Sequence, residues 1–187
     1  MRAVLFDLDG TLLDSVELIL AAYRHMMRTH HGAAPPDEVW ARGIGRPLAH
    51  QIRELADSDD QAIEMRATYR AYCLQHHDTM ARPVPGSAEL VAALADAGWR
   101  LGVVSSKRRE GIERGLALMQ LRSRFEVLVG ADDTALHKPH PRPVLYALEQ
   151  LQIAPERAVY VGDSTHDMAS GRAAGVRTAA ALWGPYS

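Results

Sequence analysis

The sequence predicts an α/β protein in which a parallel sheet carries helices on both faces and a block of helices is inserted near the N-terminus. Three observations support this prediction. A short buried strand is predicted at residues 2–7 around the apolar run Val4–Phe6, residues 15–81 contain helical patterns only, and apolar runs alternate with amphipathic segments after residue 86. Strands that alternate with helices are typical of βαβ units, whose parallel strands are covered on both faces.

Composition limits the classes of protein that the chain can represent. Its 187 residues, 47% hydrophobic and 24% charged, suffice for one core with a modest insertion. The net charge of −2 gives no electrostatic reason to expect nucleic acid or an anionic membrane as a partner. Cys73 is the single cysteine and no apolar stretch has the length of a membrane span, so we expect a cytoplasmic protein.

The inserted block is predicted to contain four helices. Apolar residues in the first recur at helical spacing, and Ala33–Pro36 ends it. Ser58, followed by Gln61 three residues later, fits a capping box at the start of the fourth helix. The predicted helices cover residues 15–31, 37–42, 47–56 and 59–78.

After Pro83–Gly86 the predicted elements alternate between helix and strand. Helices are expected at residues 87–97, 109–120, 141–151 and 166–174, and strands at 101–104, 125–129, 158–162 and 176–182. The resulting architecture is a Rossmann-like core formed by residues 1–14 and 82–187, with an all-helical cap domain at residues 15–81.

Four short polar segments are predicted to lie at the C-terminal ends of strands. Asp7 and Asp9 come directly after the first strand, and two carboxylates this close repel each other unless a cation lies between them. Ser105–Lys107, Lys138 and Asp163–Asp167 are the other three segments. Open α/β sheets bind ligands at the carboxyl ends of their strands. Lys107 and Lys138 are the only lysines in the chain, which draws attention to both.

These four segments, in this order, resemble the motifs of the haloacid dehalogenase (HAD) superfamily of phosphohydrolases, with a helical cap between the first and second motifs. Within that superfamily the chain looks most like the phosphoglycolate phosphatase group and its pyrophosphatase relatives. The resemblance implies Mg²⁺-dependent hydrolysis of a small phosphate monoester, phosphoglycolate-like, through an aspartyl-phosphate. The implied partner is a small phosphorylated metabolite, and the implied state is a monomer or homodimer.

Phosphoryl transfer needs a nucleophile, neutralisation of the phosphoryl oxygens and a proton for the leaving group. We expect Asp7 to be the nucleophile and Asp9 to be the general acid and then the general base. Ser105 and Lys138 are expected to contact the phosphoryl oxygens.

The remaining expected site residues hold the metal or the substrate. Oxygen ligands favour Mg²⁺, and the expected ligands are Asp7, Asp9 through its backbone carbonyl, Asp163 and Asp167, the last being either a ligand or a partner of one. Gly10 and Thr11 should shape the turn after the first strand and supply a backbone amide. Ser106 and, in the cap, Arg46 are the expected substrate contacts.

Several alternatives stay open or are disfavoured. A pyrophosphatase or a β-phosphoglucomutase-type phosphotransferase would share the same motifs. A dehalogenase would lack Asp9, and a phosphonoacetaldehyde hydrolase needs a cap lysine that residues 15–81 do not contain. A phospho-accepting signalling module would lack the helical insertion.

Some of these residues also have simpler explanations. Asp163 and Asp167 could act simply as helix-capping acids. The His30–His31 and His76–His77 pairs are expected to be surface or partly buried residues without zinc-site spacing.

Two features depart from the pattern of the resembled group. Ser106 stands where asparagine is usual, so the contacts with phosphate could differ. The chain ends at residue 187, earlier than the family norm, and a missing last strand would leave an exposed sheet edge.

Overall fold

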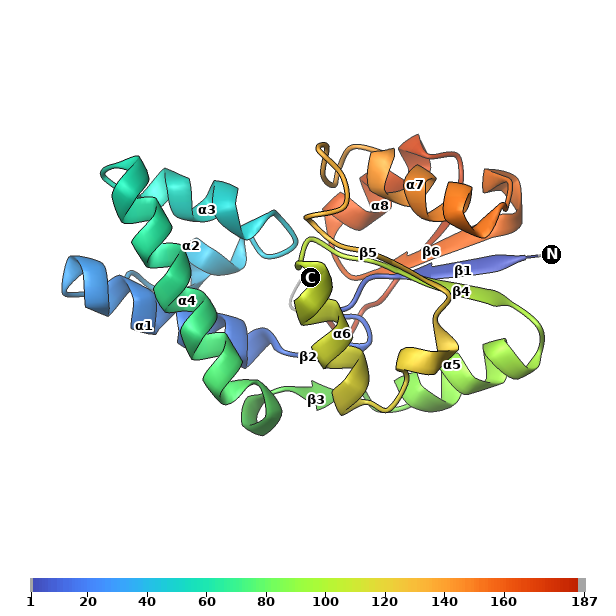
Figure 1. The fold of residues 1–187 in the computed structure, drawn as a ribbon, viewed down its shortest axis with the longest axis horizontal. Coiled ribbons are helices and arrows are strands. Elements are labelled where there is room, and N and C mark those ends of the chain that lie inside the picture. The colour runs from blue at the N-terminus through green and yellow to red at the C-terminus, as the bar shows by residue number, and fades with distance from the viewer. Residues whose placement is uncertain (1, 185–187) are drawn as a thin grey trace.

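The computed structural model describes residues 2–184 and contains a five-stranded parallel sheet at its centre (Figure 1). The strand order is β5-β4-β1-β6-β7, so the N-terminal strand β1 lies in the middle. Ala3 of β1 pairs with Arg100 on one side and Ala158 on the other. The strands are β1 (Ala3–Phe6), β4 (Arg100–Val104), β5 (Val127–Val129), β6 (Ala158–Gly162) and β7 (Arg177–Ala180).

Helices cover both faces of the sheet, as the alternating pattern predicts. Figure 1 shows one pair on each side: α5 (Ser87–Asp96) with α6 (Arg109–Leu118), and α7 (Arg142–Leu151) with α8 (Thr165–Ala173). Two short 3₁₀ turns, η1 (Arg122–Arg124) and η2 (Pro155–Arg157), precede strands β5 and β6. The prediction of an α/β core with a parallel sheet is confirmed.

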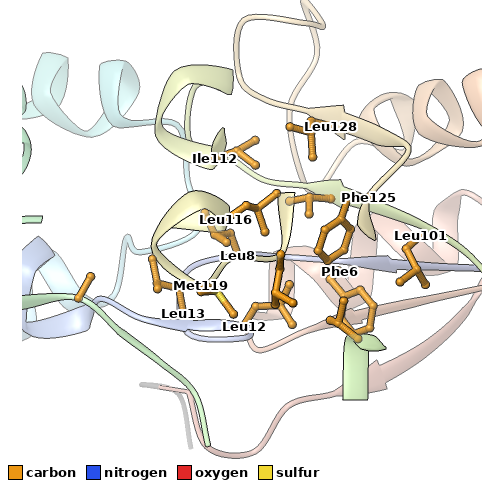
Figure 2. Packing of buried hydrophobic residues seen from close by; sticks show 14 of the residues in the cluster. Phe6, Leu8, Leu12, Leu13, Leu101, Ile112, Leu116, Met119, Phe125 and Leu128 are labelled. Atoms are coloured by element: carbon orange, nitrogen blue, oxygen red, sulfur yellow. The ribbon is translucent and has the colours of Figure 1, made fainter. Parts of the chain in front are cut away.

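Side chains of β1 alternate between two hydrophobic clusters. Val4 and Phe6 point to the side covered by α5 and α6, where Phe6 meets Phe125 edge-on with ring centroids 6.2 Å apart (Figure 2). Ala3 and Leu5 point to the side covered by α7. Because both faces are apolar, β1 is fixed at the centre of the sheet, and this position sets where the residues after it lie.

The helical block forms a separate lobe beside the sheet (Figure 1). Its helices are α1 (Val16–His31), α2 (Asp37–Ala41), α3 (Leu48–Leu55) and α4 (Asp59–Met80). The lobe has its own hydrophobic cluster, in which the rings of Tyr23 and Trp40 stack with centroids 4.8 Å apart. On this ground we propose that residues 15–81 are a cap domain and that residues 1–14 and 82–187 are the core domain.

Two chain segments connect the lobes, and they run side by side. Strand β2 (Leu13–Asp14) pairs antiparallel with β3 (Arg82–Pro83). The Val84 amide extends this ladder by donating to the Leu12 carbonyl over 2.9 Å. Any movement of the helical lobe must therefore bend both segments together.

Differences from the predicted elements are local. The strand expected at 125–129 begins at Val127, because Phe125 follows η1 and turns into the core. The final strand is shorter than residues 176–182 and lies at the edge of the sheet. At α4, Ser58 accepts the Gln61 amide over 3.1 Å, but the Gln61 side chain accepts from the Asp57 amide, so the expected capping box is only half formed. Across residues 2–184, none of the helices combines the length and apolarity required to cross a membrane.

Leu116→Ala should lower the free energy of unfolding by about 2–5 kcal/mol, because Leu116 is fully buried between α6 and the sheet and its removal leaves a cavity. Leu90→Ala, on the half-exposed side of α5, is the matched control and should change it by less than about 1 kcal/mol. Chemical denaturation measures both values. Equal losses in the two variants would contradict this picture of the core.

Candidate active site

The candidate site is a cavity of about 580 Å³ between the carboxyl ends of the sheet strands and the helical lobe. Its core wall includes Asp7, Ser105 and Asp163, and its cap wall includes Arg46 and Tyr69. Strands β1, β4 and β6 are neighbours, so the polar residues that follow them meet at one edge. Residues far apart in sequence are thus brought into one pocket, as the sequence predicts.

Asp7 is the buried carboxylate at the end of β1. Its amide donates to the Val161 carbonyl over 2.8 Å, which continues the ladder with β6 and fixes the backbone. The carboxyl oxygen Oδ1 lies 3.2 Å from Lys138 Nζ, in an ion pair whose geometry is too oblique for a hydrogen bond. Asp7 is therefore held in place with an oxygen that lacks a hydrogen-bond partner.

Lys138 supplies the cation at the base of the site. Its Nζ atom lies 2.6 Å from Asp167 Oδ1 and 3.2 Å from the Tyr160 hydroxyl, and the side chain is almost completely buried. Burial lowers the pKa of Lys138, but the carboxylates of Asp167 and Asp7 raise it above its usual value, so the ammonium stays charged. The structure places this lysine where the sequence predicts it.

Asp167 is buried and holds other groups with both carboxyl oxygens. Oδ1 accepts from Lys138, and Oδ2 accepts from the amide and the hydroxyl of Ser164 over 2.9 and 2.6 Å. The Ser164 hydroxyl oxygen also accepts the Asp167 amide, completing a capping box at α8. Asp167 thus combines the expected capping role with the positioning of Lys138, and its oxygens are less available to a metal than those of its neighbours.

Asp163 follows β6 and is held by the turn after β1. The Thr11 hydroxyl donates to Asp163 Oδ1 over 2.9 Å. Gly10 has φ +77°, and a side chain there would collide with the Asp163 carboxyl group. The indole of Trp183 donates to the Thr11 carbonyl over 3.1 Å, so the end of the described chain also packs on this turn.

The expected amide for phosphate is not offered by Gly10 or Thr11. The Gly10 amide donates to the Leu13 carbonyl over 2.8 Å, and the Thr11 amide donates to the Leu8 carbonyl over 3.2 Å. Both donors are used to close the turn. Gly10 shapes the turn as expected, whereas Thr11 contributes its hydroxyl to Asp163 instead of its amide to a substrate.

The aspartates form a cluster suited to a divalent cation. Asp7, Asp163 and Asp167 each offer a carboxylate oxygen, and these atoms lie within 4.8 Å of one another. Burial raises the pKa of Asp7 to about 8, and Asp167 and Asp163 add to the rise although Lys138 opposes it. Burial and Asp167 similarly raise the pKa of Asp163 to about 6. One lysine does not neutralise this cluster, and an oxygen-only donor set with excess negative charge fits Mg²⁺.

Asp9 lies apart from this cluster and has its own partners. Its Oδ1 atom accepts from Ser15 Oγ at 2.5 Å and from Lys107 Nζ at 2.7 Å. Sequence reasoning missed Lys107 and Ser15 as site residues. The scarcity of lysine drew attention to Lys107, but no local pattern indicates that it contacts Asp9.

Ser105 and Ser106 face different partners. Ser105 is buried against the cavity, and its hydroxyl oxygen accepts the Lys107 amide over 3.3 Å. Ser106 donates its hydroxyl hydrogen to the carbonyl of Gly45 in the helical lobe over 2.5 Å. Ser106 and Arg46 both line the cavity, where Ser106 contacts the cap loop and Arg46 in the same loop forms an ion pair with Glu54.

Of two further side chains in the cavity wall, His77 departs from the expectation drawn from the sequence and Cys73 agrees with it. His77 was expected to be at or near the surface, but it is buried, and its Nδ1 atom lies 2.7 Å from Asp78 Oδ1. Cys73 packs against the hydrophobic clusters as expected. Burial raises the pKa of the Cys73 thiol to about 11, so it remains protonated near neutral pH and is a poor nucleophile.

Comparison with known proteins agrees with this geometry. The model of the haloacid dehalogenase-like hydrolase family matches residues 4–181. The chain belongs to this family. It is a HAD-type phosphatase.

Its relatives carry two kinds of name. A protein of Caldanaerobacter subterraneus subsp. tengcongensis, provisionally named pyrophosphatase PpaX, is 42% identical over 98% of this chain and 82% of its own length. Pyrophosphatase PpaX of Bacillus cereus is 37% identical over 98% of this chain and 84% of its own. The structure of a provisional phosphoglycolate phosphatase from Lactobacillus plantarum is 31% identical, with a TM-score of 0.86 over 97% of this chain and 86% of that one.

In the presence of EDTA, we expect thermal stability to fall as the pH rises from about 4 to 8. The folded pKa values of Asp7 and Asp163 lie above 3.8, so the folded protein binds more protons than the unfolded chain, and deprotonation destabilises it. Mg²⁺ should remove most of the fall, and Asp7→Asn should flatten the EDTA curve. Melting temperatures across the pH series test this, and identical curves for the wild type and Asp7→Asn would count against it.

Ser106→Ala should loosen the cap loop at residues 43–47, because it removes the hydrogen bond to the Gly45 carbonyl. Hydrogen–deuterium exchange should show faster exchange of these amides. Ser106→Thr keeps a hydroxyl and should exchange as the wild type does. Ser123→Ala, at an exposed serine of η1, is the control. Unchanged exchange in Ser106→Ala would mean that other contacts hold the loop.

Proposed function

We propose that this phosphatase hydrolyses a small, phosphoglycolate-like phosphate monoester with Mg²⁺, through an aspartyl-phosphate on Asp7. The observation that carries the proposal is the buried Asp7 carboxylate, paired with Lys138 and within 4.8 Å of the carboxylate oxygen of Asp163. A buried carboxylate with a fixed position and an adjacent cation is suited to in-line attack on phosphorus.

The residues divide the chemistry between them. Asp7 Oδ attacks phosphorus while the bond to the leaving oxygen breaks, and Asp9 gives that oxygen a proton. Lys138 and the Ser105 hydroxyl stabilise the negative charge of the phosphoryl oxygens. Asp167 and Tyr160 position Lys138 for this contact.

The second step returns the enzyme to its starting state. Asp9, now deprotonated, takes a proton from water, the water oxygen attacks phosphorus, and the bond to Asp7 breaks to release phosphate. Ser15 and Lys107 both hold Oδ1 of Asp9, so the proton transfers are assigned to the other carboxylate oxygen, Oδ2.

A divalent cation completes the site in this proposal. Asp7, the Asp9 carbonyl and Asp163 would hold Mg²⁺, with Asp167 beside them, and when bound the ion would screen the repulsion between carboxylate and phosphate. The excess negative charge of the aspartate cluster supports this assignment.

Pyrophosphate is the second candidate substrate, because the two relatives described above are named pyrophosphatases. A β-phosphoglucomutase-type transfer would use the same first step and differ in the acceptor, a sugar in place of water. We further propose that the protein works in the cytoplasm as a monomer or homodimer. In the working cycle the cap would close over the substrate, with hinges near Asp14 and Pro83–Gly86.

Asp7→Asn should lower phosphate release by at least about a thousandfold, because the amide cannot form the acyl-phosphate. A panel of phosphoglycolate, pyrophosphate and sugar phosphates, assayed with Mg²⁺ and with EDTA, gives the measurement. Asp96→Asn, at an exposed aspartate paired with Arg124, should retain wild-type turnover. Retained turnover in a folded Asp7→Asn variant would move the nucleophile elsewhere.

A further inference from the structure

We propose that Arg66 and Arg70 of α4, with Arg108 before α6, form a receptor for a second anionic group on the substrate. The inference rests on the proposed phosphatase function and specifies its substrate class. The preferred substrate would be a phosphate compound whose leaving group is itself negatively charged.

All three guanidinium side chains line the same cavity as Asp7. Arg66 and Arg70 are one helical turn apart, so they project from the same face of α4. The intervening residue Tyr69 is close enough to Asp9 for the carboxylate to contribute to a raised Tyr69 pKa, after burial and Cys73. This turn of α4 therefore lies next to the group that would protonate the leaving oxygen.

The charges on this wall are not balanced by the protein. Other arginines of the cavity wall are paired: Arg46 with Glu54, and Arg114 with Asp78. Within the described chain, no ion pair is formed by Arg66 or Arg70, although both face solvent or the cavity. Like charges one turn apart on a helix repel each other.

The repulsion extends across the gap between the lobes. Burial lowers the pKa of Arg70 first, and the nearby cations Arg108 and Arg66 lower it further, while Asp132 and Glu110 offset only part of this effect. Arg108 itself forms an ion pair with Asp132, in which Nε of Arg108 lies 3.2 Å from Oδ2 of Asp132. An arrangement that brings three guanidinium groups from two lobes together is stabilised when an anion enters.

The chemistry of the guanidinium group defines the ligand. Its planar donors match carboxylate and phosphate oxygens in pairs, and such charge-assisted hydrogen bonds are among the stronger ones in proteins. A phosphoryl group at Asp7 would direct its leaving group past Asp9 toward α4. A carboxylate, as in phosphoglycolate, and a second phosphate, as in pyrophosphate, share the required charge.

The test compares pairs of substrates in which one member has an anionic leaving group and the other a neutral one. Phosphoglycolate and 2-hydroxyethyl phosphate have nearly the same shape, but only the first has an anionic leaving group; pyrophosphate and methyl phosphate form a second pair. The double variant Arg66→Ala/Arg70→Ala should lower kcat/KM for the anionic members by roughly 10–100-fold, as expected for lost hydrogen bonds to a charged group. The loss on the neutral members should be at least about tenfold smaller.

Control variants separate charge reading from general damage. Arg66→Lys/Arg70→Lys should recover part of the preference for anionic substrates. Arg53→Ala removes an arginine of the helical lobe that pairs with Asp59 outside the cavity wall, and it should match the wild type. Equal losses on charged and neutral substrates, or no loss on either, would overturn the receptor.

Binding without turnover distinguishes this inference from the proposed function. Calorimetry on Asp7→Asn with Mg²⁺ should show tighter binding of phosphoglycolate than of 2-hydroxyethyl phosphate, and the double arginine variant should abolish the difference. If the wild type hydrolyses no member of the panel but this binding preference is present, the proposed function fails and the receptor stands. If hydrolysis occurs and the preference is absent with and without the arginines, the receptor fails alone.

Which anion fits follows from the same measurements. If kcat/KM of the double variant falls more for pyrophosphate than for phosphoglycolate, the receptor fits a second phosphate. A larger fall for phosphoglycolate indicates that it fits a carboxylate. Either order supports the receptor.

Discussion

The ion pair network around Lys138 is the interaction on which the site depends. Lys138 is buried between the carboxylates of Asp7 and Asp167, with the Tyr160 hydroxyl as a third neighbour, so one cation faces two acids. A buried charge is tolerated only when partners compensate for the lost hydration. The network therefore fixes the position of Asp7 while leaving it short of positive charge. Because the carboxylates of the site carry more charge than Lys138 neutralises, the site favours binding of a cation and then of a phosphoryl group.

The same network explains why residues from distant parts of the chain act together. Asp167 holds Lys138 with one oxygen and the start of α8 with the other, while Thr11 ties the turn after β1 to Asp163. The Thr11–Asp163 contact joins the segments that follow the neighbouring strands β1 and β6, and the Asp167–Lys138 contact reaches from the segment after β6 to the one after β5. The central position of β1 makes this possible, since a strand at the edge would have a neighbour on one side only.

Much of this arrangement could be predicted from the sequence. Helix and strand periods gave the α/β core and the helical insertion, and the carboxyl-end rule located Asp7, Ser105, Lys138 and Asp163 at one edge. Side-chain contacts between residues far apart in the sequence could not be predicted. Ser106 bonds to Gly45, 61 residues away, and Lys107 reaches Asp9 across 98 residues, and no local pattern encodes either pairing. The sequence also could not show that the amides of Gly10 and Thr11 donate within the turn, because their partners depend on the backbone geometry at Gly10.

The paired connection between the lobes has a mechanical consequence. A single linking strand could twist freely about its own bonds, but two adjacent, hydrogen-bonded strands behave as a ribbon. A ribbon flexes readily across its flat face and resists both torsion and sideways shear. The cap closure that we propose would therefore be restricted to a nodding movement about one axis, along a repeatable path that returns Gly45 to Ser106.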